Sequence, residues 1–260
     1  MARSNETTID AAIETFVRGF CHGKSTTHPY EGTRKGRVWV MRDAPRKNPR
    51  LYRKEEWVAY GVDPTEVDAV ARANNRGRFF VCPVFALGDD EAPLLAAYKQ
   101  LGYRLLAREG MFTHNLARIS RASCAMELHR VDTHELAARF GKATRSKPMR
   151  ACDLEPEAAV RQYIACDGDA LVGWVRSTAV GAATWCSNMF VQPAYRRQGI
   201  GRALVARMLR DDRAHGATAS VLLASKAGAL LYPQVGYDQI ATLLILAPLR
   251  AARQTLSKVT

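Results

Sequence analysis

Three arginines and two glycines gather within one short segment, RRQGIGR from Arg196 to Arg202. Because glycine has no side chain, backbone N–H groups at such positions can approach phosphate oxygens closely. A helix that begins here would add the positive end of its dipole, and the arginines would add mobile positive charge. The segment therefore predicts a binding site for a phosphate-bearing ligand.

The residues around this segment predict a strand before it and a helix after it. An extended apolar run ends at Phe190 and Val191, Pro193 interrupts it, and an amphipathic helix runs toward Gly216. A dinucleotide fingerprint would need a third glycine where Leu204 stands. A Walker loop would need Gly-Lys-Ser/Thr, which the segment lacks.

This combination resembles the pyrophosphate loop of the GCN5-related N-acetyltransferase (GNAT) superfamily. That loop reads Arg/Gln-x-x-Gly-x-Gly/Ala after a strand ending in Val-x-Pro. Arg196, Gly199 and Gly201 match the loop, and Val191 and Pro193 match the end of the strand. The order of predicted strands and helices over residues 123–250 is also similar to that of the superfamily. An ordinary strand-to-helix turn is the alternative interpretation.

The resemblance implies the GNAT acyl-CoA N-acyltransferase fold, a mixed α/β sheet, with acetyl-CoA as the co-substrate. It implies contacts to acetyl-CoA from the strand before the loop, the loop itself and the end of the next strand. The residues concerned are Met189, Phe190, Val191, Arg196, Arg197, Gln198, Gly199, Ile200, Gly201, Arg202 and Ser225. Ser225 stands where many members of the superfamily have an asparagine, so its contact departs from the family pattern.

Tyr232 matches the tyrosine that protonates the departing thiolate in the superfamily. The resemblance implies that a primary amine attacks the thioester directly in a ternary complex, with Tyr232 as general acid. Full proton transfer from a phenol with a pKa of about 10 to a thiolate whose thiol has a pKa of about 8.5 is uphill by about 2 kcal/mol. Donation of the proton must therefore be concerted with departure of the thiol. Pro233 disfavours helical geometry at Tyr232. Packing under the last strand is the alternative role for this ring.

The sequence does not single out a general base. Residues 183–187, on the strand before the loop, include no carboxylate. A water chain or a carboxylate elsewhere, such as Glu127, Glu135 or Asp169, remains open. We interpret Cys186 as a buried structural thiol and not as a nucleophile.

A repeated sequence pattern within the chain predicts two related halves. The segment YKQLGY from Tyr98 to Tyr103 has the same arrangement as YPQVGY from Tyr232 to Tyr237. Each follows a leucine- and alanine-rich helix and precedes an apolar strand, at residues 105–112 and 240–246. An internal repeat is the economical explanation, and a chance match of two short turns is the alternative.

We therefore predict a degenerate GNAT-like domain at residues 1–122 and a GNAT acetyltransferase domain with the acyl-CoA site at residues 123–260. The first half has no phosphate loop, because the acidic stretch from Gly88 to Glu91 stands between its strand and its helix. We expect this half to help shape the acceptor pocket.

Periodicity and turn signals predict the remaining elements. We expect helices at residues 8–20, 55–60 and 64–74, the last capped by Asp63, and a loop at residues 22–36. A hairpin should form from residues 160–166 and 171–177. We also expect Asp132 to cap a helix through Phe140, and Ser225 to cap a short helix that carries Tyr232.

Composition limits the class of protein. The chain has 260 residues, a formal charge of +13 and 47% hydrophobic residues. It has no apolar run of about 20 residues for a membrane span, and its start does not resemble a signal peptide, so we expect a cytoplasmic protein. Its six cysteines are scattered without a C-x-x-C pair, and we expect reduced thiols and no metal site.

The expected partner is a small-molecule or peptide amine, with no membrane; the sequence sets no oligomeric state. Nine lysines and arginines stand between Arg34 and Lys54 against the single acid Asp43. Such a segment attracts anions, including nucleic acid, or forms a solvated basic loop. A non-catalytic acyl-CoA-binding regulator and a nucleic-acid-associated protein therefore stay open as alternatives to an enzyme.

Overall fold

The computed structural model describes residues 2–146 and 149–249, and its strands form one mixed sheet. The strands are β1 (Tyr30–Lys35), β2 (Val38–Asp43), β3 (Glu55–Tyr60), β4 (Phe79–Ala86), β5 (Tyr103–His114), β6 (Glu127–Arg130), β7 (Val160–Asp167), β8 (Ala170–Val180), β9 (Ala183–Val191), β10 (Ala219–Ser225) and β11 (Asp238–Pro248). Their order across the sheet is β1-β2-β3-β4-β11-β5-β10-β9-β8-β7-β6.

The helices lie on both faces of this sheet. The α-helices are α1 (Ala2–Lys24), α2 (Pro64–Asn74), α3 (Ala92–Gln100), α4 (His134–Thr144) and α5 (Ile200–Ala214). Short 3-10 helices are η1 (Pro49–Leu51), η2 (Ala151–Asp153), η3 (Pro193–Tyr195), η4 (Gly228–Leu230) and η5 (Tyr232–Val235). Within the described residues, no helix is both long and apolar enough to cross a membrane.

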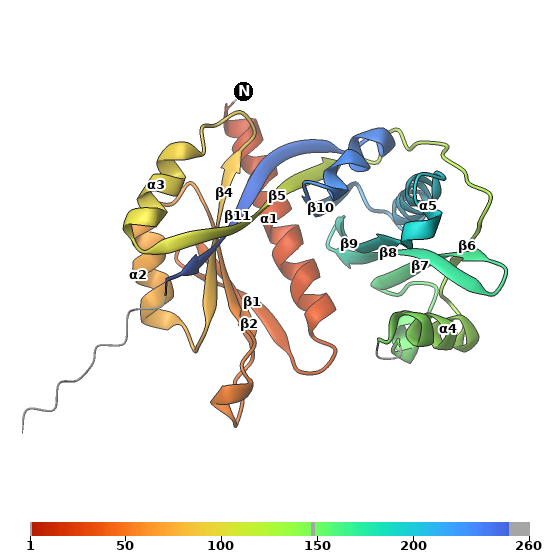
Figure 1. The fold of residues 1–260 in the computed structure, drawn as a ribbon, viewed down its shortest axis with the longest axis horizontal. Coiled ribbons are helices and arrows are strands. Elements are labelled where there is room, and N and C mark those ends of the chain that lie inside the picture. The colour runs from red at the N-terminus through yellow and green to blue at the C-terminus, as the bar shows by residue number, and fades with distance from the viewer. Residues whose placement is uncertain (1, 147–148, 250–260) are drawn as a thin grey trace, which may run out of the picture.

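The two predicted halves exchange one strand each. β11 lies between β4 and β5, and β5 lies between β11 and β10, with antiparallel pairing throughout. These two long strands run side by side across the middle of the molecule (Figure 1). The domain boundary after residue 122 stays a prediction, and the sheet continues across it. The outer ends of the two predicted domains, residues 1 and 250–260, lie outside the described residues.

The two echoed sequence segments have the same local structure. The Tyr98 and Tyr103 rings meet edge to face at 5.7 Å, and the Tyr232 and Tyr237 rings do so at the same distance. All four tyrosines are buried, and the glycine before the second tyrosine of each pair has a positive φ, 81° and 94°. The segments also enter β5 and β11, which pair with each other. These likenesses are what an internal repeat predicts.

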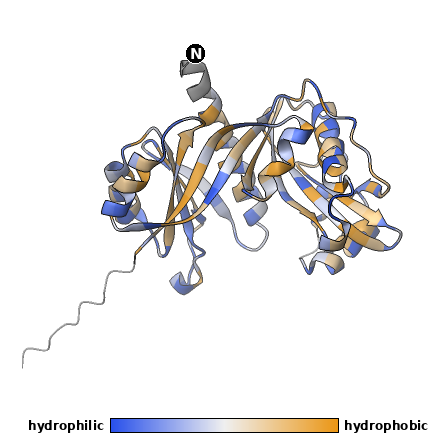
Figure 2. Ribbon diagram, turned by 45° about the horizontal axis from the view of Figure 1, so that its top comes forward, coloured by the Kyte–Doolittle hydropathy of each residue, from blue (hydrophilic) through white to orange (hydrophobic). Residues whose placement is uncertain are grey.

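Helix α1 covers the face of the sheet where the two halves meet. Its buried side chains Ile9, Ile13, Phe16 and Val17 join one apolar cluster with residues from both halves. Phe16 packs 5.1 Å from the Trp185 ring on β9. Figure 2 shows apolar residues concentrated on the central strands. The N-terminal helix therefore contributes to the core of the C-terminal half.

A buried ionic network fixes α5 to the opposite face of the sheet. The Asp212 carboxylate is fully buried and accepts hydrogen bonds from Arg161 of β7 (2.7 Å), Ser177 of β8 (2.7 Å) and Thr184 of β9 (2.9 Å). Removing one partner of such a buried pair leaves an uncompensated charge. The network therefore holds α5, the helix that begins within the glycine-rich loop from Arg196 to Gly201.

Several local predictions are wrong. Residues 55–60 form strand β3, not a helix, because this short apolar stretch pairs with β2 and β4 on its two sides. The predicted loop at residues 22–36 contains strand β1. The sequence of this edge strand is mostly polar because only Tyr30 is buried. Thr133, not Asp132, caps α4, accepting a hydrogen bond from the Leu136 N–H.

The basic segment from Arg34 to Lys54 is folded, with strands β1 and β2 and helix η1. Asp43 organises its second part, because it accepts hydrogen bonds from Arg46 Nε (2.8 Å) and Arg53 Nε (2.7 Å). Burial alone would raise the pKa of Asp43, but these hydrogen bonds hold it well below its usual range. Arg37 donates to the Gly61 carbonyl as well. Part of the positive charge is therefore used within the fold.

Candidate functional site

Strands β9 and β10 diverge near their carboxyl ends. They pair in parallel over only three residue pairs, from Ala183 with Ala219 to Trp185 with Val221. Beyond that point β9 continues to Val191 and β10 to Ser225, with no further pairing between them in the described structure. The sheet therefore has a V-shaped opening beside the glycine-rich loop.

A β-bulge on β9 accompanies this divergence. Trp174 of β8 pairs with Phe190, and Arg176 pairs with Ser187, so two residues of β9 face one residue of β8. Asn188, inside the bulge, has a φ of 53°, in the left-handed region that asparagine tolerates better than most residues. Bulges bend a strand and increase its twist. The bulge was not anticipated from the sequence, although Asn188 is the residue type that suits it.

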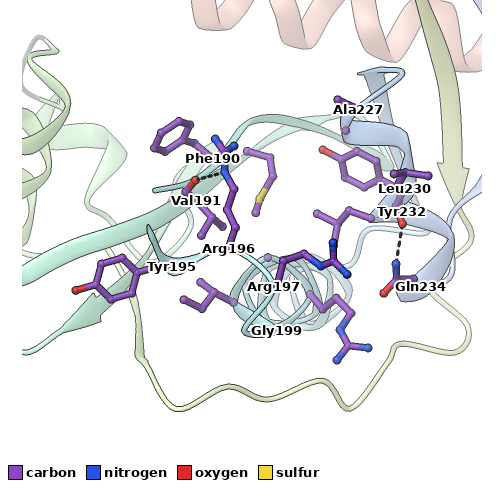
Figure 3. Close-up of a pocket in the computed structure, with 16 residues that line it drawn as sticks. Phe190, Val191, Tyr195, Arg196, Arg197, Gly199, Ala227, Leu230, Tyr232 and Gln234 are labelled. Carbon is purple, nitrogen blue, oxygen red and sulfur yellow. Dashed lines mark hydrogen bonds between the residues drawn. The ribbon is translucent and has the colours of Figure 1, made fainter. Parts of the chain in front are cut away.

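A cavity of about 860 Å³ lies at this opening (Figure 3). Its walls come from β9, the glycine-rich loop, the first turn of α5 and the two 3-10 helices after β10. The lining residues are Met189, Phe190, Val191, Tyr195, Arg196, Arg197, Gly199, Ile200, Gly201, Arg202, Ala227, Gly228, Leu230, Leu231, Tyr232 and Gln234.

The structure brings together all the predicted site residues except Gln198 and Ser225. Gln198 donates to the Ala194 carbonyl (3.4 Å), and Ser225 Oγ accepts the Gly228 N–H (3.4 Å). Neither residue lines the cavity. Sequence reasoning missed Tyr195, Gln234 and the lining residues of the segment 227–231. Except for Tyr195 and Gln234 they are small or apolar, so only their place after β10 could have indicated them.

The first turn of α5 leaves backbone donors free to face the cavity. Gly199 is the N-terminal cap residue, with a φ of 80° and no capping side chain, and the first turn has no acidic residue. The helical bonds begin with the Ala203 N–H, so the N–H groups of residues 200–202 have no acceptor within the helix. A Cβ at Gly201 would lie 3.1 Å from Met189 Cε. These features suit a bound anion.

Three arginines surround these donors. Arg196 donates from Nε to the Val191 carbonyl (3.0 Å), and its guanidinium lies 6.0 Å from the centre of the Phe190 ring. Arg197 and Arg202 line the cavity and make no hydrogen bond or ion pair with another described residue. Arg197 and Arg202 thus leave positive charge available beside the free N–H groups. This arrangement is suited to binding a diphosphate such as that of coenzyme A.

Tyr232 lies on the other side of the cavity from Phe190 (Figure 3). The predicted single helix is wrong here, because η4 ends at Leu230 and η5 begins at Tyr232, immediately before Pro233. The Tyr232 ring is only 6% exposed, and its hydroxyl has no hydrogen-bond partner among the described residues. Burial, with a smaller effect from Cys186, raises the pKa of Tyr232, so the phenol stays protonated.

None of the three carboxylates considered as a base lies in the cavity wall. Glu127 is on β6 with an exposed side chain, and Glu135 and Asp169 are also exposed. Cys186 is buried, and burial raises the pKa of its thiol. A neutral, enclosed thiol is a packing group and a poor nucleophile. Within the described residues, no cluster of His, Cys, Asp and Glu could hold a metal ion.

The N-terminal half has a counterpart of this site that differs at each element. Its strand β3 pairs with β4 along its whole length, so there is no opening. The turn before α2 is Gly61 to Asp63, and it, not the acidic stretch at residues 88–91, corresponds in topology to the phosphate loop. Asp63 accepts a hydrogen bond from the Thr65 N–H (2.8 Å), and Pro64 has no N–H. This helix start is therefore already satisfied.

Comparison with known proteins agrees with this geometry. Residues 159–239 match the family model described as "Acetyltransferase (GNAT) domain". No curated protein matches the chain.

Solved structures resemble most of the chain. A GCN5-related N-acetyltransferase from Kribbella flavida has a TM-score of 0.63 at 16% identity, over 93% of this chain and 96% of that one. One from Sphaerobacter thermophilus has a TM-score of 0.56 at 13% identity, over 81% and 76%. A tandem GNAT protein from the clavulanic acid biosynthesis pathway has a TM-score of 0.52 at 12% identity, over 91% and 94%. The likeness to the GNAT superfamily is thus confirmed: the chain has the GNAT fold, with a GNAT domain match at residues 159–239.

Proposed function

We propose that this protein transfers an acetyl group from acetyl-CoA to a primary amine, in a ternary complex, with Tyr232 as general acid. The observation that supports this most strongly is the opening between β9 and β10, which leads to an uncapped helix start surrounded by arginines. Such an opening offers free strand edge to the pantetheine arm and free N–H groups to the diphosphate. The domain match at residues 159–239 points to the same reaction class.

In this proposal, some residues of the cavity wall bind acetyl-CoA and others take part in the reaction. Arg196, Arg197 and Arg202, with the N–H groups of residues 200–202, would hold the diphosphate. The unpaired edge of β9 at Met189 to Val191 would align the pantetheine arm and offer N–H groups to the thioester carbonyl. Donors fixed in advance stabilise the negative charge that develops on that oxygen. Bound acetyl-CoA supplies the activated acetyl group.

Tyr232 would then protonate the thiolate as it departs. Because its pKa is raised, the phenol is fully protonated at neutral pH but is a weak acid. Transfer of its proton must therefore be concerted with cleavage of the carbon–sulfur bond. Gln198 and Ser225 remain proposed contacts for the part of the cofactor outside the cavity wall.

A screen of primary amines with acetyl-CoA, recording the release of free thiol, tests the proposal. We expect release with at least one small-molecule or peptide amine and none with acetyl-CoA alone. A protein that binds coenzyme A but acetylates no amine would instead fit a non-catalytic regulator.

A nucleic-acid-associated protein remains the less favoured alternative. The arginines that Asp43 binds are only part of the basic segment, and Lys47 and Arg50 remain at the surface. Binding to DNA or RNA with an affinity that falls steeply with salt would favour this alternative.

A cytoplasmic location is also part of the proposal.

A further inference from the structure

A row of residues crosses the sheet beside the opening. In the strand register, Glu109 of β5 pairs with Ser225 of β10 on one side and with Leu243 of β11 on the other. Cross-strand partners point to the same face of a sheet. Met111, two residues after Glu109, belongs to the apolar cluster under α1. Glu109 therefore lies on the α1 face, opposite to α5.

This position lies one strand away from the turn that lines the cavity. Ser225 ends β10 and caps the turn whose residues Ala227 and Gly228 line the cavity. β9 and β10 are unpaired beyond Trp185 and Val221, so the opening between them extends to the end of β10, where Ser225 stands. An acceptor that approaches from the α1 face would meet Glu109 there.

The charge around Glu109 is not balanced. Its carboxylate makes no hydrogen bond or ion pair with another described residue, although the side chain is partly buried. Glu56 on β3 has Lys24 of α1 at 3.1 Å, and Cys82 on β4 is neutral because burial raises its pKa. Burial raises the pKa of Glu109, and the Glu56 charge adds to this shift.

Glu56 thus has Lys24 as its partner, whereas Glu109 has no partner among the described residues and lies in apolar surroundings. The partly buried apolar side chains packed on this face are Phe20, Tyr60, Phe80, Ala86, Val180, Leu223, Ile240 and Ile245. A carboxylate held away from water without a partner is unfavourable, and a cation from a ligand would relieve it.

We propose that Glu109 binds the ammonium group of the acceptor and takes its proton, and that the acceptor is a primary amine with an apolar substituent. This inference rests on the proposed function. The ammonium gives one proton to the Glu109 carboxylate, which later releases it to water. The amine nitrogen forms a bond to the thioester carbon, the carbon–sulfur bond breaks, and Tyr232 gives its proton to the sulfur. The new amide nitrogen loses its second proton, which restores the Tyr232 hydroxyl.

The test compares Glu109→Gln with the wild type and with Glu127→Gln, an exposed control. Each protein, saturated with coenzyme A, is titrated calorimetrically with hexylamine and benzylamine, and turnover with acetyl-CoA is measured from pH 6 to 9. We expect Glu109→Gln to weaken amine binding at least tenfold and to lower kcat/KM about 100-fold, with the KM for acetyl-CoA unchanged. Glu109→Asp should recover part of the activity, and Glu127→Gln should match the wild type.

The melting temperature of Glu109→Gln without ligand should equal or exceed that of the wild type, because an unpaired charge is removed. Amine affinity and turnover of Glu109→Gln within twofold of the wild type would overturn the inference, and so would the absence of amine binding by a wild type that binds coenzyme A. Failure of the wild type to bind coenzyme A would instead overturn the proposed function.

Discussion

The two halves share a topology, yet within residues 2–146 and 149–249 only the C-terminal half has the features of an anion site. In the C-terminal half, β9 leaves β10 after three residue pairs, and α5 begins at a bare glycine among arginines. In the N-terminal half, β3 stays paired with β4 over six residue pairs, and Asp63 caps α2. The same framework offers backbone donors to an anion where its strand edge and helix start are left unsatisfied, and offers few where they are satisfied internally.

The largest expected effect concerns how each half anchors its helix. Asp212→Asn should leave the buried Arg161 without its charge partner and lower the free energy of unfolding by about 3–5 kcal/mol. In α2, Asp68 contacts the exposed Arg72 and the Tyr103 hydroxyl, so Asp68→Asn should cost only about 1 kcal/mol. Urea unfolding followed by circular dichroism measures both. Equal losses would show that the two helices are anchored alike.

The paired tyrosines offer the next comparison. Tyr232→Phe should lower turnover about 100-fold while coenzyme A binding is kept, because only the proton donor is removed. Tyr98, its counterpart, has a buried hydroxyl without a hydrogen-bond partner among the described residues, so Tyr98→Phe should leave turnover unchanged and stability equal or higher. Steady-state kinetics with a reactive amine decides this. Wild-type turnover by the Tyr232→Phe enzyme would show that Tyr232 is not the general acid.

A smaller effect is expected from single arginines. Arg197→Ala removes a cation that has no partner in the described part of the chain, and should weaken coenzyme A binding about tenfold. Arg34→Ala, on β1 of the N-terminal half, should leave that affinity unchanged, since Arg34 lies over the Trp39 ring and does not line the β9–α5 cavity. Calorimetric titration of both variants provides the measurement. Similar losses from the two changes would mean that general charge, not the loop, determines affinity.

Local signals predicted the elements that depend on near neighbours. Asp63 and Pro64 gave the start of α2, and the glycines among arginines gave the loop before α5. Residues 55–60 were mistaken for a helix because a short apolar stretch has no clear period, and its strand partners lie elsewhere in the chain.

Features that depend on distant contacts could not be inferred from the sequence. The exchange of β5 and β11 and the place of Glu109 beside Ser225 both depend on strand register between the halves. Asp212 did leave a signal, because it falls on the apolar stripe of α5 with Met208 and Leu209, where a carboxylate needs buried partners. The two 3-10 turns before β11 follow from Pro233, whose effect on the direction of Tyr232 required the structure.

The most direct test of the central claim is the stoichiometry of coenzyme A binding. Isothermal titration of the folded wild-type chain should give one site per chain, lost in a variant that combines Arg196→Glu with Arg197→Glu. Two equivalent sites would show that the N-terminal half binds the same ligand, and no binding at millimolar concentration would contradict the account of the β9–α5 cavity.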